Sequence, residues 1–284
     1  MQQIKNYLSL VTFSHTVFAM PFALIGFFLA IYNGYPFSWR LLLLVILCMI
    51  FARNAAMAFN RFVDRSIDLK NPRTALREIP RGILRPRSVL FFTAINSILF
   101  ITTAAFINSL TLALSPVALF IILGYSFTKK FTSLCHFILG LGLSLAPIGA
   151  YLAVASRFQI IPLLFSFIVF FWVSGFDIIY ALQDESFDKT EKLHSLPVHI
   201  GRRHSLVFSA IAHLFSAALV ISAGCILNAS FYYWFGSLIF IGLLIYQHIF
   251  ITHDNISHIN RAFFTLNGIA SIFFAFFTIA DFLF

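Results

Sequence analysis

Apolar segments of about 20 residues follow one another along almost the whole of this sequence, and they constrain its fold more than any other feature. A helix of 20 residues rises about 30 Å, which is the thickness of the hydrocarbon core of a bilayer. Of the 284 residues, 60% are hydrophobic and only 10% are charged, whereas soluble domains carry roughly 25% charged residues. The sequence therefore predicts an all-α, polytopic membrane protein.

We predict nine transmembrane helices. Their approximate ranges are 11–32, 41–59, 89–107, 110–127, 136–155, 160–182, 205–227, 231–251 and 262–283. The first apolar run is too long for a signal-peptide core and no small-residue cleavage pattern follows it, so we expect it to be a retained span. No linker rich in Pro, Gly or Ser divides the chain, which favours a single domain over residues 1–284.

The basic residues predict the orientation in the membrane. All 19 Lys and Arg residues except Arg40 and Arg157 fall on the side that holds the amino terminus and the loops near 60–88, 128–135, 183–204 and 252–261. The side rich in Lys and Arg is normally cytoplasmic. We therefore expect a cytoplasmic amino terminus and an external carboxyl terminus. The net charge of +9 then follows from topology and contact with anionic lipid, and nucleic-acid binding is not indicated.

Two sets of polar residues stand at helix ends on the predicted cytoplasmic side. Asn60, Asp64 and Asp68 recur at steps of four, and Asp177, Asp184 and Asp188 at steps of seven and four. A helix advances 100° per residue, so we expect each set to line one face of its helix. A charge at membrane depth costs about 2.5–3.5 kcal/mol or more, which favours a functional role. The alternative is local ion pairing, with Arg61 or Arg65 for the first set and Lys189 for the second.

Facing carboxylates with few competing Cys or His residues are typical of an Mg²⁺ site, where the ion is shared with substrate phosphates. Basic residues stand near both sets and could hold phosphate oxygens: Arg61, Arg65, Arg73, Arg77, Lys129 and Lys130. The combination predicts a diphosphate site at the membrane surface. Cys48, Cys135 and Cys225 show no paired spacing and are predicted to be buried packing residues. An isolated His15, and Asp254 between His253 and His258, are predicted to be structural or solvated residues.

These residues resemble the signatures of the UbiA-type intramembrane aromatic prenyltransferases. The first signature is similar to residues 53–68, which end in Asn60, Asp64 and Asp68, and continues through 71–74 and 77–82. The second is similar to residues 177–188. Further matching positions are Tyr125 to Thr132, His136, and Leu139 with Gly140. One departure is Glu191-Lys192-Leu193, where many members of the family carry a Gly, so the geometry of this loop is not transferred.

The resemblance implies nine helices around a central cavity and the transfer of a polyprenyl group from its diphosphate to an aromatic acceptor. It implies that Asp64, Asp68, Asp184 and Asp188 are catalytic, and that these four and Asn60 hold Mg²⁺. The substrate-binding residues would be Asn60, Arg73, Arg77, Lys129, Lys130, Asp177 and Tyr180. The expected partners are the two substrates and membrane lipid, with no obligate protein partner. The expected location is the inner membrane of a bacterium.

Several alternatives stay open. The acceptor is expected to be a hydroxylated aromatic carboxylate such as 4-hydroxybenzoate, but dihydroxynaphthoate, for menaquinone synthesis, fits equally well, and the isoprenoid length is not encoded in a visible motif. An ion-coupled transporter would also carry intramembrane carboxylates. Transporters place such acids near the midplane, however, whereas here they lie at helix ends. Membrane CDP-alcohol phosphotransferases require an Asp-Gly-x2-Ala-Arg stretch, which is absent.

Overall fold

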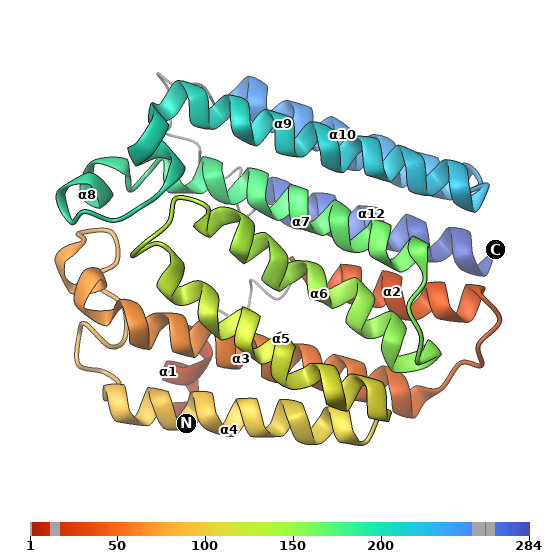
Figure 1. Cartoon of the computed structure of the whole chain (residues 1–284), viewed down its shortest axis with the longest axis horizontal. Helices are drawn as coiled ribbons and strands as arrows, with labels where there is room; N and C mark the ends of the chain where they lie inside the picture. The colour runs from red at the N-terminus through yellow and green to blue at the C-terminus, as the bar shows by residue number, and fades with distance from the viewer. Residues whose placement is uncertain (1, 12–17, 252–258, 260–264) are drawn as a thin grey trace.

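The computed structural model describes residues 2–11, 18–251, 259 and 265–284, and in these ranges all regular structure is helical (Figure 1). Seven helices are long and apolar enough to cross a membrane: α3 (Trp39–Lys70), α4 (Pro86–Ala105), α5 (Ser109–Thr128), α6 (Cys135–Ala155), α7 (Ile160–Ala181), α9 (Leu196–Leu227) and α10 (Phe231–Phe250). Two apolar helices are shorter, α2 (Met20–Tyr32) and α12 (Asn267–Leu283). The polytopic helical class is confirmed, while nine spans and a central cavity stay predictions.

Two short helices complete the described chain, α1 (Gln2–Leu10) and α8 (Glu185–Thr190). Leu10 at the end of α1 packs against Ala58 of α3 and Val89 of α4. The helix α8 was not expected from the sequence, and it follows the end of α7 in the segment that carries the second acidic set. His15, His253, Asp254 and His258 lie outside the described residues.

Capping residues fix several helix starts. The Ser38 side chain accepts a hydrogen bond from Leu41 N at 3.4 Å, and Asn108 accepts one from Thr111 N at 2.8 Å. Such caps satisfy backbone N–H groups that have no partner inside the helix. Pro86 begins α4, a position where its missing N–H is no loss. Asn108 therefore separates α4 from α5 although the two apolar runs are almost continuous in sequence.

The helices run roughly parallel or antiparallel, with α7 between α6 and α9 (Figure 1). Trp172 of α7 is fully buried in an aromatic cluster with Phe22, Phe176 and Phe240. Its indole N–H donates to Asn267 Oδ1 of α12 at 3.0 Å. Burial of such aromatic side chains and satisfaction of their polar atoms hold α2, α7, α10 and α12 in one packed core.

Glycine is needed on α2 for a close helix contact and on α9 for a backbone conformation. A Cβ on Gly26 of α2 would lie 2.0 Å from the Pro147 carbonyl oxygen of α6, so no larger residue fits there without movement. Gly201 interrupts α9 with φ 76° and ψ 167°, a backbone conformation that favours glycine. The predicted span 205–227 is thus the regular part of a longer element that starts at Leu196.

The prediction for the cysteines is only partly correct. Cys48 and Cys135 are half-buried, but Cys225 is exposed on α9. Its neighbours Ala223 and Gly224 are buried, so Cys225 lies on the outward face of the helix. An apolar run in a membrane helix does not distinguish the face that packs inside the protein from the face that contacts lipid, because both are apolar.

Candidate active site

The polar residues of both signatures lie at one end of the bundle, where α3 and α7 end and where α8 is placed (Figure 1). Asn60, Asp64 and Asp68 occupy the last turns of α3, and the two aspartates are 3% and 4% exposed. Asn60 Nδ2 donates to Asp64 Oδ2 at 3.2 Å. The expected alignment of this set on one helix face is confirmed, because α3 continues without a break through all three positions.

The second set does not share one helix, so that expectation is wrong. Asp177 belongs to α7, which ends at Ala181, while Asp184 precedes α8 and Asp188 lies within it. The N–H groups of residues 182, 183 and 184 bond three residues back rather than four. This tighter turn, common at helix ends, rotates the chain differently from an α-helix and separates Asp177 from the other two.

Each acid of the first set is neutralised by a base from another segment. Lys129 Nζ, at the end of α5, lies 2.7 Å from Asp64 Oδ2, and Arg77 Nη1 lies 2.7 Å from Asp68 Oδ1. Ion pairs do form, as we expected if the acids had only a structural role. They are not, however, the local pairs with Arg61 or Arg65. Arg65 instead donates to Phe62 O at 2.7 Å. Contacts between distant segments bring the loop after α3 and the end of α5 to the same point.

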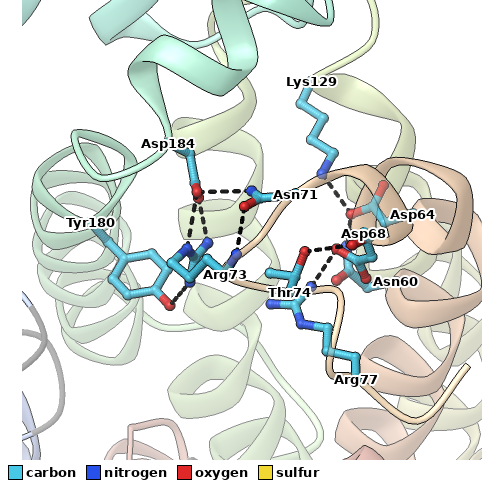
Figure 2. A network of polar contacts seen from close by, with 10 residues as sticks. All are labelled: Asn60, Asp64, Asp68, Asn71, Arg73, Thr74, Arg77, Lys129, Tyr180 and Asp184. Atoms are coloured by element: carbon cyan, nitrogen blue, oxygen red, sulfur yellow. Dashed lines mark hydrogen bonds and ion pairs between the residues drawn. The ribbon is translucent and has the colours of Figure 1, made fainter. Parts of the chain in front are cut away.

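Asp184 is held from the loop that follows α3. Asn71 Nδ2 donates to Asp184 Oδ1 at 3.0 Å, and the Arg73 guanidinium binds both carboxylate oxygens, with Nε 2.9 Å from Oδ1. Arg73 Nη1 also donates to the Tyr180 hydroxyl at 2.7 Å. Figure 2 shows this loop between the Asp184 group on one side and Asp64 with Asp68 on the other. A bidentate Arg–carboxylate pair fixes orientation as well as charge.

The electrostatics of the surface loops follow from these contacts. Burial opposes the charge of Arg73, but the hydrogen bonds and charges of Asp184 and Tyr180 outweigh it, so the pKa of Arg73 is raised. Burial and the nearby charge of Asp184 raise the pKa of Asp188 to about 6, against the opposing effect of Lys129. Asp188 therefore lies in a place where an additional cation would favour its ionised form.

Asp177 and Lys130 have different surroundings from those of the other predicted residues. Asp177 Oδ2 lies 2.7 Å from His136 Nδ1 of α6. The sequence offered no reason to pair these two residues. Lys130 is exposed, and its ammonium lies 5.6 Å from the centre of the Phe127 ring. Lys130 is near enough to Asp64 for their charges to interact, although its ammonium lies over an aromatic face.

The fit of these residues to Mg²⁺ can be judged from the carboxylates. Asp64 Oδ1 and Asp68 Oδ2 are buried and accept no hydrogen bond within the part of the chain that the structure describes. Buried carboxylate oxygens normally have a donor or a cation beside them. Among the described residues, no group of three or more His, Cys, Asp or Glu is close enough to hold a metal ion. The oxygen donors suit Mg²⁺. The five predicted ligands form two separate groups, one on α3 (Asn60, Asp64 and Asp68) and one at α8 (Asp184 and Asp188).

Comparison with known proteins decides the family. The model of the UbiA prenyltransferase family matches residues 19–275. The chain belongs to this family. Its membership also agrees with the seven long apolar helices, so this UbiA family member is an integral membrane protein.

Curated relatives cover most of the UbiA chain. The 4-hydroxybenzoate octaprenyltransferase of Aliivibrio fischeri (strain MJ11) is 28% identical over 242 residues, which are 85% of this chain and 84% of the relative. The protein with the same name from Tolumonas auensis is 30% identical over 243 residues, or 85% and 84% of the two chains.

Solved structures share the fold. A UbiA homologue from Aeropyrum pernix K1 has a TM-score of 0.85 and 29% identity, over 94% of this chain and 98% of that one. A homologue from Archaeoglobus fulgidus bound to GPP and Mg²⁺ has a TM-score of 0.78 over 98% and 100% of the two chains, at 19% identity. The second similarity supports the fold alone.

Two groups of the UbiA site could not be selected from sequence. Asn71 lies beyond the last acid of the first set. Its Nδ2 joins the loop to Asp184 by donating to Asp184 Oδ1 at 3.0 Å, while its Oδ1 accepts from Arg73 N at 3.0 Å. Its place directly after α3, where it caps the helix, was a signal for a turn but not for a partner 113 residues away. His136 was one of the positions that match the family, without any indication of its role.

Proposed function

We propose that this chain transfers a polyprenyl group from polyprenyl diphosphate to a hydroxylated aromatic acid, 4-hydroxybenzoate or a close analogue, in quinone biosynthesis. The observation that carries the proposal is the set of three paired acids and bases at one end of an apolar bundle: Asp64 with Lys129, Asp68 with Arg77, and Asp184 with Arg73. Acids suit a divalent cation and bases suit a diphosphate. The relatives named 4-hydroxybenzoate octaprenyltransferase support the choice of substrates.

The carboxylates are proposed to hold Mg²⁺. Asp64 and Asp68 each have a buried oxygen without a hydrogen bond from the described residues, which leaves a lone pair for a cation. Asn60, Asp184 and Asp188 complete the proposed set. Bound Mg²⁺ would carry part of the negative charge that grows on the departing diphosphate. The Archaeoglobus fulgidus homologue, which shares the fold, is itself bound to GPP and Mg²⁺.

The basic residues are proposed to hold the diphosphate. Arg73, Arg77 and Lys129 come from the loop after α3 and the end of α5, and each already has its charged group at the site. Lys130 and Tyr180 lie beside them, and Lys130 is proposed to contribute charge from the exposed rim. These groups would stabilise the leaving oxygens as the allylic C–O bond breaks, because charged donors placed in advance act most strongly on developing charge.

The chemistry has three balanced events. The allylic C–O bond breaks and its electron pair stays with diphosphate. A ring carbon ortho to the hydroxyl attacks the allylic carbon with ring electrons, and a C–C bond forms. The C–H bond at that ring carbon then breaks, its electrons restore the aromatic ring, and the proton leaves. An apolar bundle suits this sequence because water would capture the allylic cation.

The test is direct. Purified protein would be incubated with a labelled polyprenyl diphosphate and, separately, 4-hydroxybenzoate, dihydroxynaphthoate and unsubstituted benzoate, with Mg²⁺ or with EDTA. We expect a prenylated 4-hydroxybenzoate product only with Mg²⁺. Labelled dihydroxynaphthoate product instead would assign the menaquinone alternative, and no ring product with any acceptor would refute aromatic prenyl transfer.

Variants sharpen this test. Asp64→Asn and Asp184→Asn keep the shape of the side chain and remove its charge, so each should lower kcat by about 10²–10³-fold, the scale expected for loss of one charge-stabilising group. Glu191→Gln is a matched control, because Glu191 lies near the same surface but pairs with Lys70 at 2.6 Å. Near-normal turnover of both aspartate variants at saturating Mg²⁺ would remove them from the mechanism.

The placement in the cell is part of the same proposal. We propose nine spans in a single domain, with the site end facing the cytoplasm of a bacterium, where Mg²⁺ and aromatic acids are available. The excess of Lys and Arg on the loops at that end supports this orientation. The bacterial relatives support an inner-membrane location.

A further inference from the structure

A second kind of carboxylate pair lies beside the diphosphate site. His136, the second residue of α6, is 3% exposed, and its Nδ1 is 2.7 Å from Asp177 Oδ2 of α7. On the other side of the imidazole, Leu196 N donates to Nε2 at 3.4 Å. Three segments that are distant in sequence therefore meet at one buried histidine.

The close approach of α6 and α7 has a clear cause. Gly140 lies one turn after His136, and Ser174 lies one turn before Asp177. A Cβ on Gly140 would be 2.4 Å from Ser174 Oγ and 2.6 Å from Phe170 O. Only a residue without a side chain allows the helices to pack this closely, and the short distance places the imidazole against the carboxylate.

The imidazole of His136 is held from both sides. Its Nδ1 faces the Asp177 carboxylate, and its Nε2 faces the Leu196 N–H. A ring that is fixed at both nitrogens holds the carboxylate beside it in one orientation.

This distinguishes Asp177 from the acids of the diphosphate site. Asp64, Asp68 and Asp184 are each paired with a Lys or Arg, whereas the partner of Asp177 is a buried imidazole. Asp177 is nevertheless near the reaction centre. Tyr125 is close enough to interact with the charges of both Asp64 and Asp177, and Asp177 lies one turn before Tyr180 on α7.

We propose that Asp177 is the proton acceptor of the prenyl transfer and that His136 is its positioning residue. This rests on the proposed function. After the new C–C bond has formed, the C–H bond at the substituted ring carbon breaks, its electron pair returns to the ring, and the proton goes to the Asp177 carboxylate. The proton is released to water before the next turnover. His136 keeps the carboxylate oriented toward this task, as outer partners of catalytic groups do.

The experiment uses 4-hydroxybenzoate deuterated at the two ring positions ortho to the hydroxyl. Wild-type chain, His136→Ala, His136→Asn and Asp177→Asn are compared for kcat and for the ratio of rates with the protonated and the deuterated acid. We expect His136→Ala to lower kcat by about 10- to 100-fold, as losses of such outer partners typically do. We also expect its isotope effect to exceed that of the wild type, because proton removal has become slower relative to C–O cleavage.

Conservative replacement and a control separate positioning from general damage. The asparagine amide of the His136→Asn variant can still donate one N–H near the position of Nδ1, so this variant should recover part of kcat and show a smaller isotope effect. His204→Ala removes an exposed histidine of α9 that bonds only locally, to Ile200 O at 3.0 Å, and should behave as wild type.

The outcomes are distinct. An unchanged isotope effect in His136→Ala and Asp177→Asn, or a His136→Asn variant no better than His136→Ala, overturns the proposal even if kcat falls. Should His136→Ala fail to fold, the comparison of His136→Asn and Asp177→Asn with wild type decides it in the same way. Failure of the wild-type chain to prenylate any ring would instead refute the proposed function.

Discussion

The Lys129 ammonium lies 2.7 Å from the Asp64 carboxylate, with the acid on α3 and the base at the end of α5. Arg77 and Arg73 make equivalent pairs with Asp68 and Asp184. Each of these proposed diphosphate ligands is therefore bound to a proposed Mg²⁺ ligand in this structure. A base that is paired with a carboxylate is not fully available to a phosphate. The binding of Mg²⁺ to the acids and the binding of diphosphate to the bases are therefore coupled.

We expect pyrophosphate to bind more tightly with Mg²⁺ present than in EDTA, and Mg²⁺ to bind more tightly with pyrophosphate, by the same factor. Coupling of this kind is typically about 5- to 150-fold. Isothermal titration of the purified protein, corrected for the magnesium pyrophosphate complex that forms in solution, measures both affinities. Lys129→Met should weaken pyrophosphate binding and reduce the coupling. Equal pyrophosphate affinities in Mg²⁺ and EDTA would contradict the prediction.

Arg73 tests whether geometry or charge matters at the proposed diphosphate site. Arg73→Ala should raise the KM for polyprenyl diphosphate by the equivalent of about 1.5–3 kcal/mol, the usual contribution of a charged hydrogen bond. Arg73→Lys should recover only part of this, because lysine keeps the charge but lacks the planar fork that binds Asp184 through two bonds. Arg81→Ala, an exposed arginine in the same loop, is the control. If all three variants had the same KM for polyprenyl diphosphate, Arg73 would contribute to membrane topology and not to diphosphate binding.

Orientation can be read by thiol labelling. In a variant with Cys48, Cys135 and Cys225 replaced, a cysteine at Ser186 of α8 should react with a membrane-impermeant reagent only in opened cells. A cysteine at Phe158, which is 55% exposed in the turn between α6 and α7, should react in intact cells. Asn228, which ends α9 on the same predicted side, is less suitable because its φ is 49° and a cysteine would be strained there. Labelling of residue 186 from outside would reverse the predicted orientation.

Stability at the opposite end of the bundle depends on Asp281 of α12. Its carboxylate accepts from Ser230 N and Tyr233 N, both at 3.1 Å, and so caps the first turn of α10. Asp281→Ala should lower the free energy of unfolding by about 0.5–2 kcal/mol, as for other lost helix caps. Asp281→Asn, which keeps an acceptor oxygen, should lose less. Thermal unfolding in detergent measures both, and an equal loss in the two variants would contradict a capping role.

The first acidic set could be predicted because its information is local. Asn60, Asp64 and Asp68 follow helical spacing, and α3 continues through them. The second set could not, because the turn at residues 182–184 follows a tighter hydrogen-bond pattern that spacing does not reveal. Three-residue and four-residue hydrogen bonding differ by little in energy at a helix end, so the surrounding contacts decide between them.

Partners between distant segments were also beyond the sequence. Lys129 was identified as a base near the site, but nothing in its neighbourhood selects Asp64 over the other acids. The pair His136 and Asp177 depends on how closely α6 approaches α7, which is set by Gly140 against Ser174. The sequence predicts which residues carry charge, whereas the packing of whole helices determines which charges meet.

The length of α3 has a consequence for the surrounding lipid. Its 32 residues extend about 48 Å at 1.5 Å per residue, well beyond a hydrocarbon core of about 30 Å. The surplus lifts Asp64 and Asp68 toward the headgroups while the apolar part of the same helix stays among the acyl chains. Lipids with longer acyl chains would place these acids inside the hydrocarbon core. Lipids with shorter chains would expose apolar turns of the helix to water. Either mismatch costs free energy in proportion to its size. Bilayer thickness thus acts on the same helix that carries the acids, so we expect the proposed reaction to depend on the acyl-chain length of the host membrane.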